Sequence, residues 1–255
     1  MAGFEQKHVI VTGGGGGIGS QTVRRFAAAG ARVAIFDRDL AAASRLADEV
    51  EQAGGEARAF ACDITDRGQI DAALEAARLV FGPVSILVNN AGWDIFRPFL
   101  KTSPDEWRKL IDINLVGALH MHHAVLPDMI AQTHGRIINI ASDAARVGSS
   151  GEAVYAACKA GLVGFSKTIA REHARHNITV NIVCPGPTDT ALLASVTDGA
   201  GDPEKLREAF RRAIPLGRLG SADDLPGAIL FFASEDASFV TGQVLSVSGG
   251  LTMAG

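Results

Sequence analysis

The chain has 255 residues, of which 47% are hydrophobic and 20% charged, so it can bury a large core and is not a disordered chain. Its net charge of −4 excludes the strongly basic surface that binds nucleic acid or anionic membranes. No apolar stretch approaches the roughly 20 residues of a membrane span, and we expect no secretory signal. Three cysteines without metal-ligand spacing fit a reducing compartment, so we expect a cytoplasmic protein.

Short β-branched runs alternate with longer alanine-rich segments along the chain. Strands are expected at residues 8–12, 32–36, 57–61, 85–89, 136–141, 179–184 and 243–248. Helices are expected at residues 18–29, 39–53, 66–81, 105–131, 152–176 and 222–234. Nearly continuous apolar strands predict a parallel sheet that is covered on both faces. The alternation therefore predicts one doubly wound α/β domain over residues 1–255.

One region interrupts this alternation. Residues 185–221 are rich in Pro and Gly and contain the helix-like run "EKLREAFRRA". Long insertions outside a sheet are commonly functional. We predict that residues 187–217 form a lid over the substrate.

A glycine-rich segment, "TGGGGGIG" at residues 12–19, joins the first expected strand to the first helix. Backbone without Cβ can approach a pyrophosphate closely, and a helix N-terminus offers N–H groups and positive dipole. Asp37 follows the second strand, where an acid binds the ribose hydroxyls of NAD and repels the 2′-phosphate of NADP. Arg38 can accept that phosphate, so NADP stays an alternative to the favoured NAD.

Tyr155 and Lys159 stand four residues apart in an expected helix and so share one face. The pKa of tyrosine is ordinarily about 10, too high for a general base near neutrality. A cation about 4 Å away supplies on the order of 4 kcal/mol at an effective dielectric of about 20, enough to lower this pKa to about 7–8. We therefore expect Lys159 to lower the pKa of Tyr155. Ser149 and Glu152 form an S-x-x-E pattern that predicts a capping box before Tyr155.

The ordered motifs resemble the short-chain dehydrogenase/reductase family. They are "TGGGGGIG" (12–19), "NNAG" (89–92), Asn114, Ser142, the Tyr155/Lys159 pair and "PG" (185–186). The resemblance implies a Rossmann-type domain with a seven-stranded parallel sheet, assembled as a homotetramer or homodimer. It also implies that Tyr155 removes the alcohol proton while hydride passes to NAD. Ser142 would then bind the same oxygen, Asn114 would hold a water beside Lys159, and Lys159 would bind the nicotinamide ribose.

The resemblance further implies a set of cofactor contacts. These are Gly13, Gly16, Gly17 and Ile18 at the pyrophosphate, Asp37 at the adenosine ribose, Asp63, Ile64 and Asn90 around the adenosine, and Tyr155, Lys159, Thr188 and Thr190 around the nicotinamide. Thr188 departs from the family, which more often has a branched aliphatic residue there. No carboxylate or cysteine completes a zinc set around the histidine pairs, so we expect no metal.

The segments "NNAGWDIFRPF", "ASDAARVGSSGEAVYAACK" and "CPGPTDTALL" resemble the 2-hydroxycyclohexanecarboxyl-CoA dehydrogenases of this family. This likeness implies an acyl-CoA substrate and a cyclohexane pocket made by Trp93, Phe96, Val147, Leu192 and Leu193. The alternatives are a 3-oxoacyl carrier-protein reductase or another alcohol, polyol or steroid dehydrogenase. A further alternative from another class is an NAD-sensing module without turnover.

Overall fold

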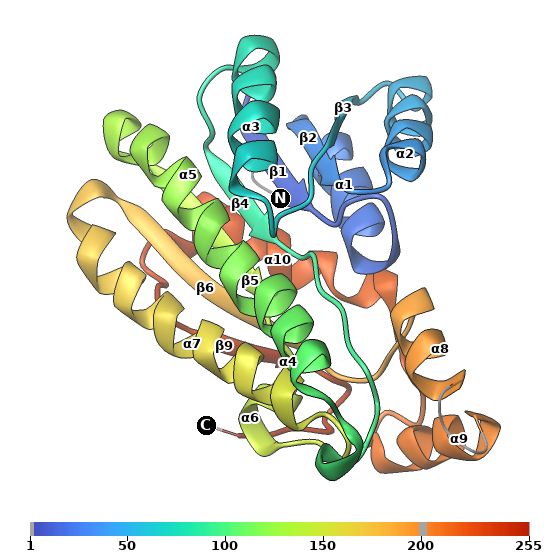
Figure 1. Ribbon diagram of the computed structural model, residues 1–255. Coiled ribbons are helices and arrows are strands. Elements are labelled where there is room, and N and C mark those ends of the chain that lie inside the picture. Colours follow the sequence, from blue (N-terminus) through green and yellow to red (C-terminus); the bar gives the residue numbers. More distant parts are fainter. Residues whose placement is uncertain (1–2, 199–202, 255) are drawn as a thin grey trace.

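The computed structural model describes residues 3–198 and 203–254, and it contains one seven-stranded parallel sheet in the order β3-β2-β1-β4-β5-β6-β9 (Figure 1). The strands are β1 (His8–Thr12), β2 (Arg32–Asp37), β3 (Glu56–Ala61), β4 (Ile86–Asn89), β5 (Gly135–Ile140), β6 (Ile178–Pro185) and β9 (Val244–Val247). Each strand end lies within one residue of its expected position, which confirms the doubly wound α/β fold.

Helices cover both faces of this sheet. One layer holds α1 (Gly17–Ala28), α2 (Leu40–Gln52) and α10 (Pro226–Ala233); the other holds α3 (Arg67–Phe81), α5 (Gly117–Gln132) and α7 (Ala153–His173). Strand β1 shows why two layers are needed: Val9 and Val11 pack into the first core and Ile10 packs into the second. Successive side chains of a strand point to opposite faces, so an apolar strand must be covered twice.

The helix expected over residues 105–131 is built from three pieces. They are α4 (Pro104–Ile111), a π-helical turn (Asp112–Val116) and α5, which contains Pro127. A π turn inserts an extra residue into the helix and is frequent at functional sites. Apolar periodicity gives no signal for such a turn, which here contains the buried Asn114.

The capping box expected from Ser149 and Glu152 does not form, so this prediction was wrong. Helix α7 begins at Ala153 with Glu152 as N-cap and without a side-chain cap. The only bond between the two residues joins their backbones, from Glu152 N–H to the Ser149 carbonyl at 3.2 Å. The Glu152 carboxyl is instead hydrogen-bonded to Asp94, a residue from a distant part of the chain.

The predicted lid region contains two helices outside the sheet, α8 (Ala191–Asp198) and α9 (Pro203–Ala213), seen beyond α4 in Figure 1. Two short strands, β7 (Thr188–Asp189) and β8 (Gly220–Ser221), pair in parallel at its ends. Residues 199–202 of the predicted lid lie outside the described residues. The short helix α6 (Ala144–Val147) has no counterpart among the expected elements. Within the described residues, no helix is long and apolar enough to cross a membrane.

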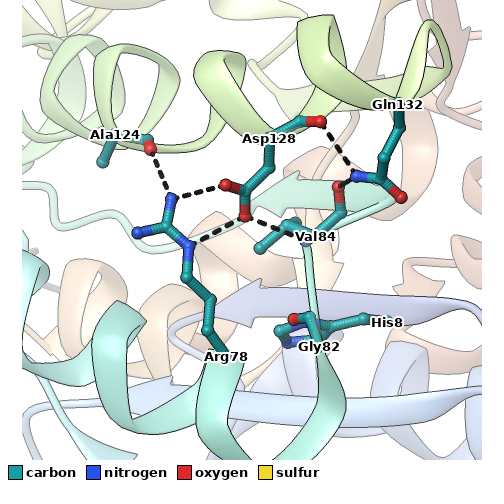
Figure 2. A network of polar contacts seen from close by, with 7 residues as sticks. All are labelled: His8, Arg78, Gly82, Val84, Ala124, Asp128 and Gln132. Carbon is teal, nitrogen blue, oxygen red and sulfur yellow. Dashed lines mark hydrogen bonds and ion pairs between the residues drawn. The ribbon is translucent and has the colours of Figure 1, made fainter.

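A polar network joins α3, α5 and the segment entering β4, as Figure 2 shows. Arg78 forms an ion pair with Asp128 at 2.8 Å, and Asp128 also accepts the Val84 N–H at 3.0 Å. Gln132 donates to the Val84 carbonyl at 2.9 Å. This network lies at the amino-terminal edge of the sheet, so it stabilises the fold at the end opposite the loops that follow the strands.

Two fully buried histidines predict a loss of stability in mild acid. His8 and His122 are 0% and 1% exposed, and burial lowers the pKa of each to about 4. An unfolded histidine titrates near 6.5, so between these values the unfolded chain binds protons that the folded chain does not. The free energy of unfolding therefore falls as the pH drops through this window, by about 2 kcal/mol per histidine between pH 7 and pH 5. Urea unfolding at both pH values should show that His122→Asn loses about 2 kcal/mol less than the wild type. Equal losses would contradict the prediction.

Candidate active site

The loops after β1 and β4 border a cleft of about 1210 Å³ at the carboxyl edge of the sheet. The strand order changes direction between these two strands. Open α/β sheets bind their ligands at such a switch point, because the loops that follow the two strands separate there. The volume exceeds that of an ordinary pocket for one small ligand and leaves room for a cofactor beside a substrate.

The glycine loop between β1 and α1 fits a pyrophosphate. Gly13 has a φ of +60°, and a Cβ at this position would lie 2.8 Å from Ala91 Cα. Helix α1 begins at Gly17 after an N-cap, Gly16, that has no side chain to accept the first N–H groups. These groups are left to bind an anion at the wall of the cleft, which Gly13, Gly16, Gly17 and Ile18 all line.

Asn90 holds this loop in shape. Its amide donates to the carbonyl oxygens of Thr12 and Gly13, both at 3.0 Å, while its backbone N–H donates to Thr12 Oγ1 at 3.0 Å. Asn90 also lines the cleft. The structure thus gives this predicted ribose neighbour a clear positioning task on the glycine loop.

Asp37 ends β2 at the cleft wall with its carboxylate fixed by two backbone N–H groups. Oδ2 accepts from Gly15 and Oδ1 from Asp39, each at 2.9 Å. Asp63 and Ile64, which follow β3, line the neighbouring part of the cleft. Together these residues form the end of the cleft where the adenosine half of a dinucleotide fits.

Thr188 and Thr190 line the other side of the cleft. The Thr190 methyl carbon lies 3.7 Å from the point that a Cβ on Gly17 would occupy, so the two segments face each other across the glycine loop. The Thr188 hydroxyl donates to the Gly186 carbonyl at 2.9 Å. The polar side chain that departs from the family pattern is therefore satisfied within its own turn.

Ser142, Tyr155 and Lys159 meet in the middle of the cleft. Ser142 follows β5, and the other two come from the first turns of α7. The Ser142 hydroxyl hydrogen-bonds to Tyr155, and Lys159 Nζ donates to the Ile140 carbonyl at 3.0 Å. Lys159 is 3% exposed, and burial lowers its pKa to about 8, which leaves the ammonium mostly protonated at pH 7.

Asn114 lies behind this group and does not line the cleft. Its amide donates to the carbonyls of Trp93 at 2.7 Å and Leu110 at 3.0 Å, and its Oδ1 accepts the Trp93 N–H at 3.2 Å. A Cβ on Gly92 would contact both Asn114 Oδ1 and Lys159 Nζ, at 3.1 and 3.5 Å. The π-helical turn thus places Asn114 next to Lys159 and anchors the loop after β4.

The expectation that Lys159 lowers the pKa of Tyr155 is wrong for the structure as it stands. Burial raises this pKa above its ordinary value, the carboxyl groups of Asp94 and Glu152 raise it further, and only the hydrogen bond from Ser142 lowers it. Lys159 Nζ is directed to the Ile140 carbonyl and lies 5.6 Å from the centre of the phenol ring. The physical reason is that the cost of burying a phenolate near two acids exceeds the effect of an ammonium that does not contact it.

Four of the five residues expected in the substrate pocket, Trp93, Val147, Leu192 and Leu193, line the cleft. Lys109 Nζ lies over the Trp93 ring at 3.9 Å. The structure does not bring Phe96 to the cleft wall. Its ring lies against Gly151, because the Arg97 N–H bonds to the Gly151 carbonyl at 2.9 Å and holds this segment against the loop before α7.

The sequence interpretation missed Asp94 and Glu152, which both line the cleft. Asp94 is 6% exposed, and its carboxyl is hydrogen-bonded to that of Glu152. A signal for Glu152 was present, because a residue three positions before Tyr155 shares its side of the helix. The buried acid in "NNAGWD" gave a weaker one.

Known proteins resemble the chain over nearly its whole length. Residues 14–252 match a family model described as Enoyl-(Acyl carrier protein) reductase. The 3-oxoacyl-[acyl-carrier-protein] reductase FabG of Escherichia coli (strain K12) is 38% identical, over 98% of this chain and 99% of that protein. The (2S)-[(R)-hydroxy(phenyl)methyl]succinyl-CoA dehydrogenase subunit BbsD of Thauera aromatica is 37% identical, over 98% of each.

The solved structure of levodione reductase superposes with a TM-score of 0.93 and 30% identity, covering 97% of this chain and 98% of that one. The seven-stranded fold and the cleft at the switch point agree with these matches. The chain therefore belongs to the short-chain dehydrogenase/reductase family, oxidoreductases that interconvert alcohols and ketones with a nicotinamide cofactor.

Proposed function

We propose that the protein oxidises the secondary alcohol of an acyl-CoA thioester to a ketone with NAD. The proposed substrate is 2-hydroxycyclohexane-1-carboxyl-CoA and the product is 2-oxocyclohexane-1-carboxyl-CoA. The observation that carries the proposal is the meeting of Ser142, Tyr155 and Lys159 beside an uncapped, glycine-rich helix N-terminus in one cleft.

In this proposal Tyr155 takes the hydroxyl proton, and Ser142 donates a hydrogen bond to the same oxygen. The hydrogen bond between these two side chains supports a shared contact with one substrate oxygen. When bound, NAD accepts the hydride. Lys159 contributes a buried positive charge next to the phenol, and Asn114 fixes the loop that carries Trp93.

Asp37 supports NAD as the cofactor rather than NADP. Its carboxylate is held at the cleft wall by Gly15 and Asp39, so it cannot swing away from a ribose without losing both bonds. A 2′-phosphate at this place would meet a fixed negative charge. The proposed cofactor contacts are those of the predicted set, from Gly13 to Thr190, all of which line the cleft.

Two observations support a cyclic thioester as the substrate. The far part of the cleft has an apolar wall that includes Trp93, Val147, Leu192 and Leu193. Two relatives are named as dehydrogenases of a hydroxyl-bearing succinyl-CoA and, in Pseudomonas putida at 39% identity, of 2,3-dihydroxy-2,3-dihydro-p-cumate. We propose that α8 and α9 cover the bound substrate as a lid.

The proposed enzyme works in the cytoplasm as a homotetramer or homodimer. Strand β9 forms an edge of the sheet, and Phe239 and Leu245 near it are exposed. Such apolar side chains on a sheet edge support burial against another copy of the chain.

A 3-oxoacyl carrier-protein reductase is the second candidate. FabG proteins are among the relatives, and Arg38 lines the cleft beside Asp37, where it can bind a 2′-phosphate. This candidate predicts a preference for NADPH and for a linear carrier-bound ketone.

A substrate panel separates these candidates. The purified protein is offered NAD with 2-hydroxycyclohexanecarboxyl-CoA, its free acid or 3-hydroxybutyryl-CoA, and NADPH with a 3-oxoacyl carrier protein. We expect NADH formation with the cyclic thioester and at least a ten-fold lower kcat/KM for the other substrates. Turnover of the linear thioester alone would overturn the alicyclic substrate, and preference for NADPH with the carrier protein would establish the second candidate. Cofactor binding without turnover of any substrate would favour an NAD-sensing module.

A further inference from the structure

Asp94 and Glu152 form a hydrogen-bonded carboxyl pair beside Tyr155. Asp94 lies in the loop after β4 and its Oδ1 accepts the Ile95 N–H at 2.7 Å. Its neighbours Trp93 and Ile95 both pack against the apolar cluster that contains Tyr155. Glu152 approaches from the other side, as the N-cap of α7 three residues before the tyrosine. Both side chains line the cleft.

A hydrogen bond between two carboxyl groups requires a proton, because a carboxylate can only accept. The pair therefore holds one proton and carries one negative charge near neutrality. Burial, followed by the hydrogen bond to Glu152, raises the pKa of Asp94 to about 9, so Asp94 is the protonated member. Like charges in close contact cannot both ionise, and the two groups titrate as one unit.

The other titratable groups around the pair are Lys159, Lys109, Cys158 and Cys184. Lys159 on α7 is charged and favours the ionised form of Asp94, but less than burial and Glu152 oppose it. Lys109 on α4 lies over Trp93 at the rim. Burial raises the pKa of both cysteines, so their thiols are neutral near neutrality. The charge of the pair thus faces Tyr155 against the single buried ammonium of Lys159.

We propose that the Asp94–Glu152 pair keeps the proton on the Tyr155 phenol near neutral pH, and thereby sets the alkaline range in which the enzyme oxidises alcohols. The two residues act through Tyr155 as positioning residues for its proton. The proposal rests on the proposed role of Tyr155 in proton transfer. With its proton held in place, the phenol is ready to donate to a ketone oxygen at neutral pH, whereas alcohol oxidation needs a higher pH.

The chain offers a direct readout, because Tyr155 is its only tyrosine. The ultraviolet absorbance of phenolate during a pH titration therefore reports this residue alone, and it needs no substrate. Wild type, Glu152→Gln, Asp94→Asn and the double variant are titrated with NAD bound. Asp105→Asn is the matched control, because Asp105 also lines the cleft but pairs with Arg108 at 2.6 Å.

The double variant should form phenolate at a pH lower by about one unit or more, the size of effect that a nearby like charge has on a pKa. Each single variant should shift it less, because the remaining carboxyl can carry the charge alone. The pH at which kcat/KM for oxidation is half-maximal should move in parallel, and Asp105→Asn should move neither value. Asp94→Asn with Glu152→Ala is a second neutral version if the first fails to fold, since Glu152 is only partly buried.

An unchanged phenolate midpoint in the folded double variant would overturn the proposal. A single variant that shifts the midpoint as far as the double variant would overturn the shared proton. Because the absorbance titration involves no turnover, a wrong substrate assignment leaves its result intact. A shifted midpoint without a shifted pH–rate profile would show instead that Tyr155 is not the proton carrier, which is a failure of the proposed function.

Discussion

Tyr155→Phe should lower kcat for alcohol oxidation by about 100- to 10,000-fold, the range that positioned proton transfer contributes. The phenol oxygen is the group that hydrogen-bonds to Ser142, and phenylalanine lacks it while keeping the ring. The ring packs with Leu110 and Ala144, so this packing should survive the substitution. Steady-state rates of NADH formation measure the effect.

The control for this variant is cofactor affinity. Trp93 lines the cleft, so its fluorescence reports NADH binding. Tyr155→Phe should bind NADH within a few-fold of the wild type, because the glycine loop and Asp37 are unchanged. A variant that keeps more than about a tenth of the wild-type kcat would show that the phenol is not the main proton carrier.

The second large effect concerns the choice of cofactor. Asp37→Ser should lower the ratio of kcat/KM for NAD to kcat/KM for NADP by about 100-fold or more. Two like charges about 4 Å apart at an effective dielectric of about 20 repel by roughly 4 kcal/mol, which is ample for such a change. The substitution also lets Arg38, which lines the same corner of the cleft, reach a 2′-phosphate.

Asp39→Ser is the matched control for Asp37→Ser. Asp39 is the next acid along the chain, and its side chain caps α2 by accepting the Ala42 N–H at 3.0 Å. A serine keeps the cap and removes one charge from the same corner. The control should leave the cofactor ratio within a few-fold of the wild type. An equal change in both variants would mean that general charge, rather than the fixed Asp37 carboxylate, governs the preference.

The fold was predictable because its strands are short, apolar and β-branched, and because each is followed by a helix. Val9, Ile10 and Val11 of β1 are all fully buried, as a strand covered on both faces requires. The glycine loop and Asp37 were predictable for a related reason, since their positions directly after β1 and β2 determine where they lie.

The local departures were not predictable from pattern. The π turn around Asn114 leaves the apolar periodicity nearly unchanged, and Phe96 is kept from the cleft by a backbone bond between Arg97 and Gly151. Glu152 was assigned to a cap because Ser149 stood at the right spacing. Its actual partner, Asp94, is brought to it by the packing of the β4 loop against α7, which only the folded chain reveals.

The raised pKa of Tyr155 follows from the same long-range contact. Spacing on the helix correctly places Lys159 near the phenol, but it gives neither the direction of Nζ nor the depth of burial. The electrostatics of a buried group depend on all the elements that surround it, and here the loop after β4 supplies one of the two acids.

Hydride transfer from the alcohol carbon is the central claim, and an isotope label tests it most directly. The purified protein with NAD is given 2-hydroxycyclohexanecarboxyl-CoA that carries deuterium on the carbinol carbon, and the nicotinamide product is analysed by mass spectrometry. We expect one deuterium in every NADH formed, together with the 2-oxo thioester. NADH without deuterium, or consumption of the thioester without NADH, would contradict the account.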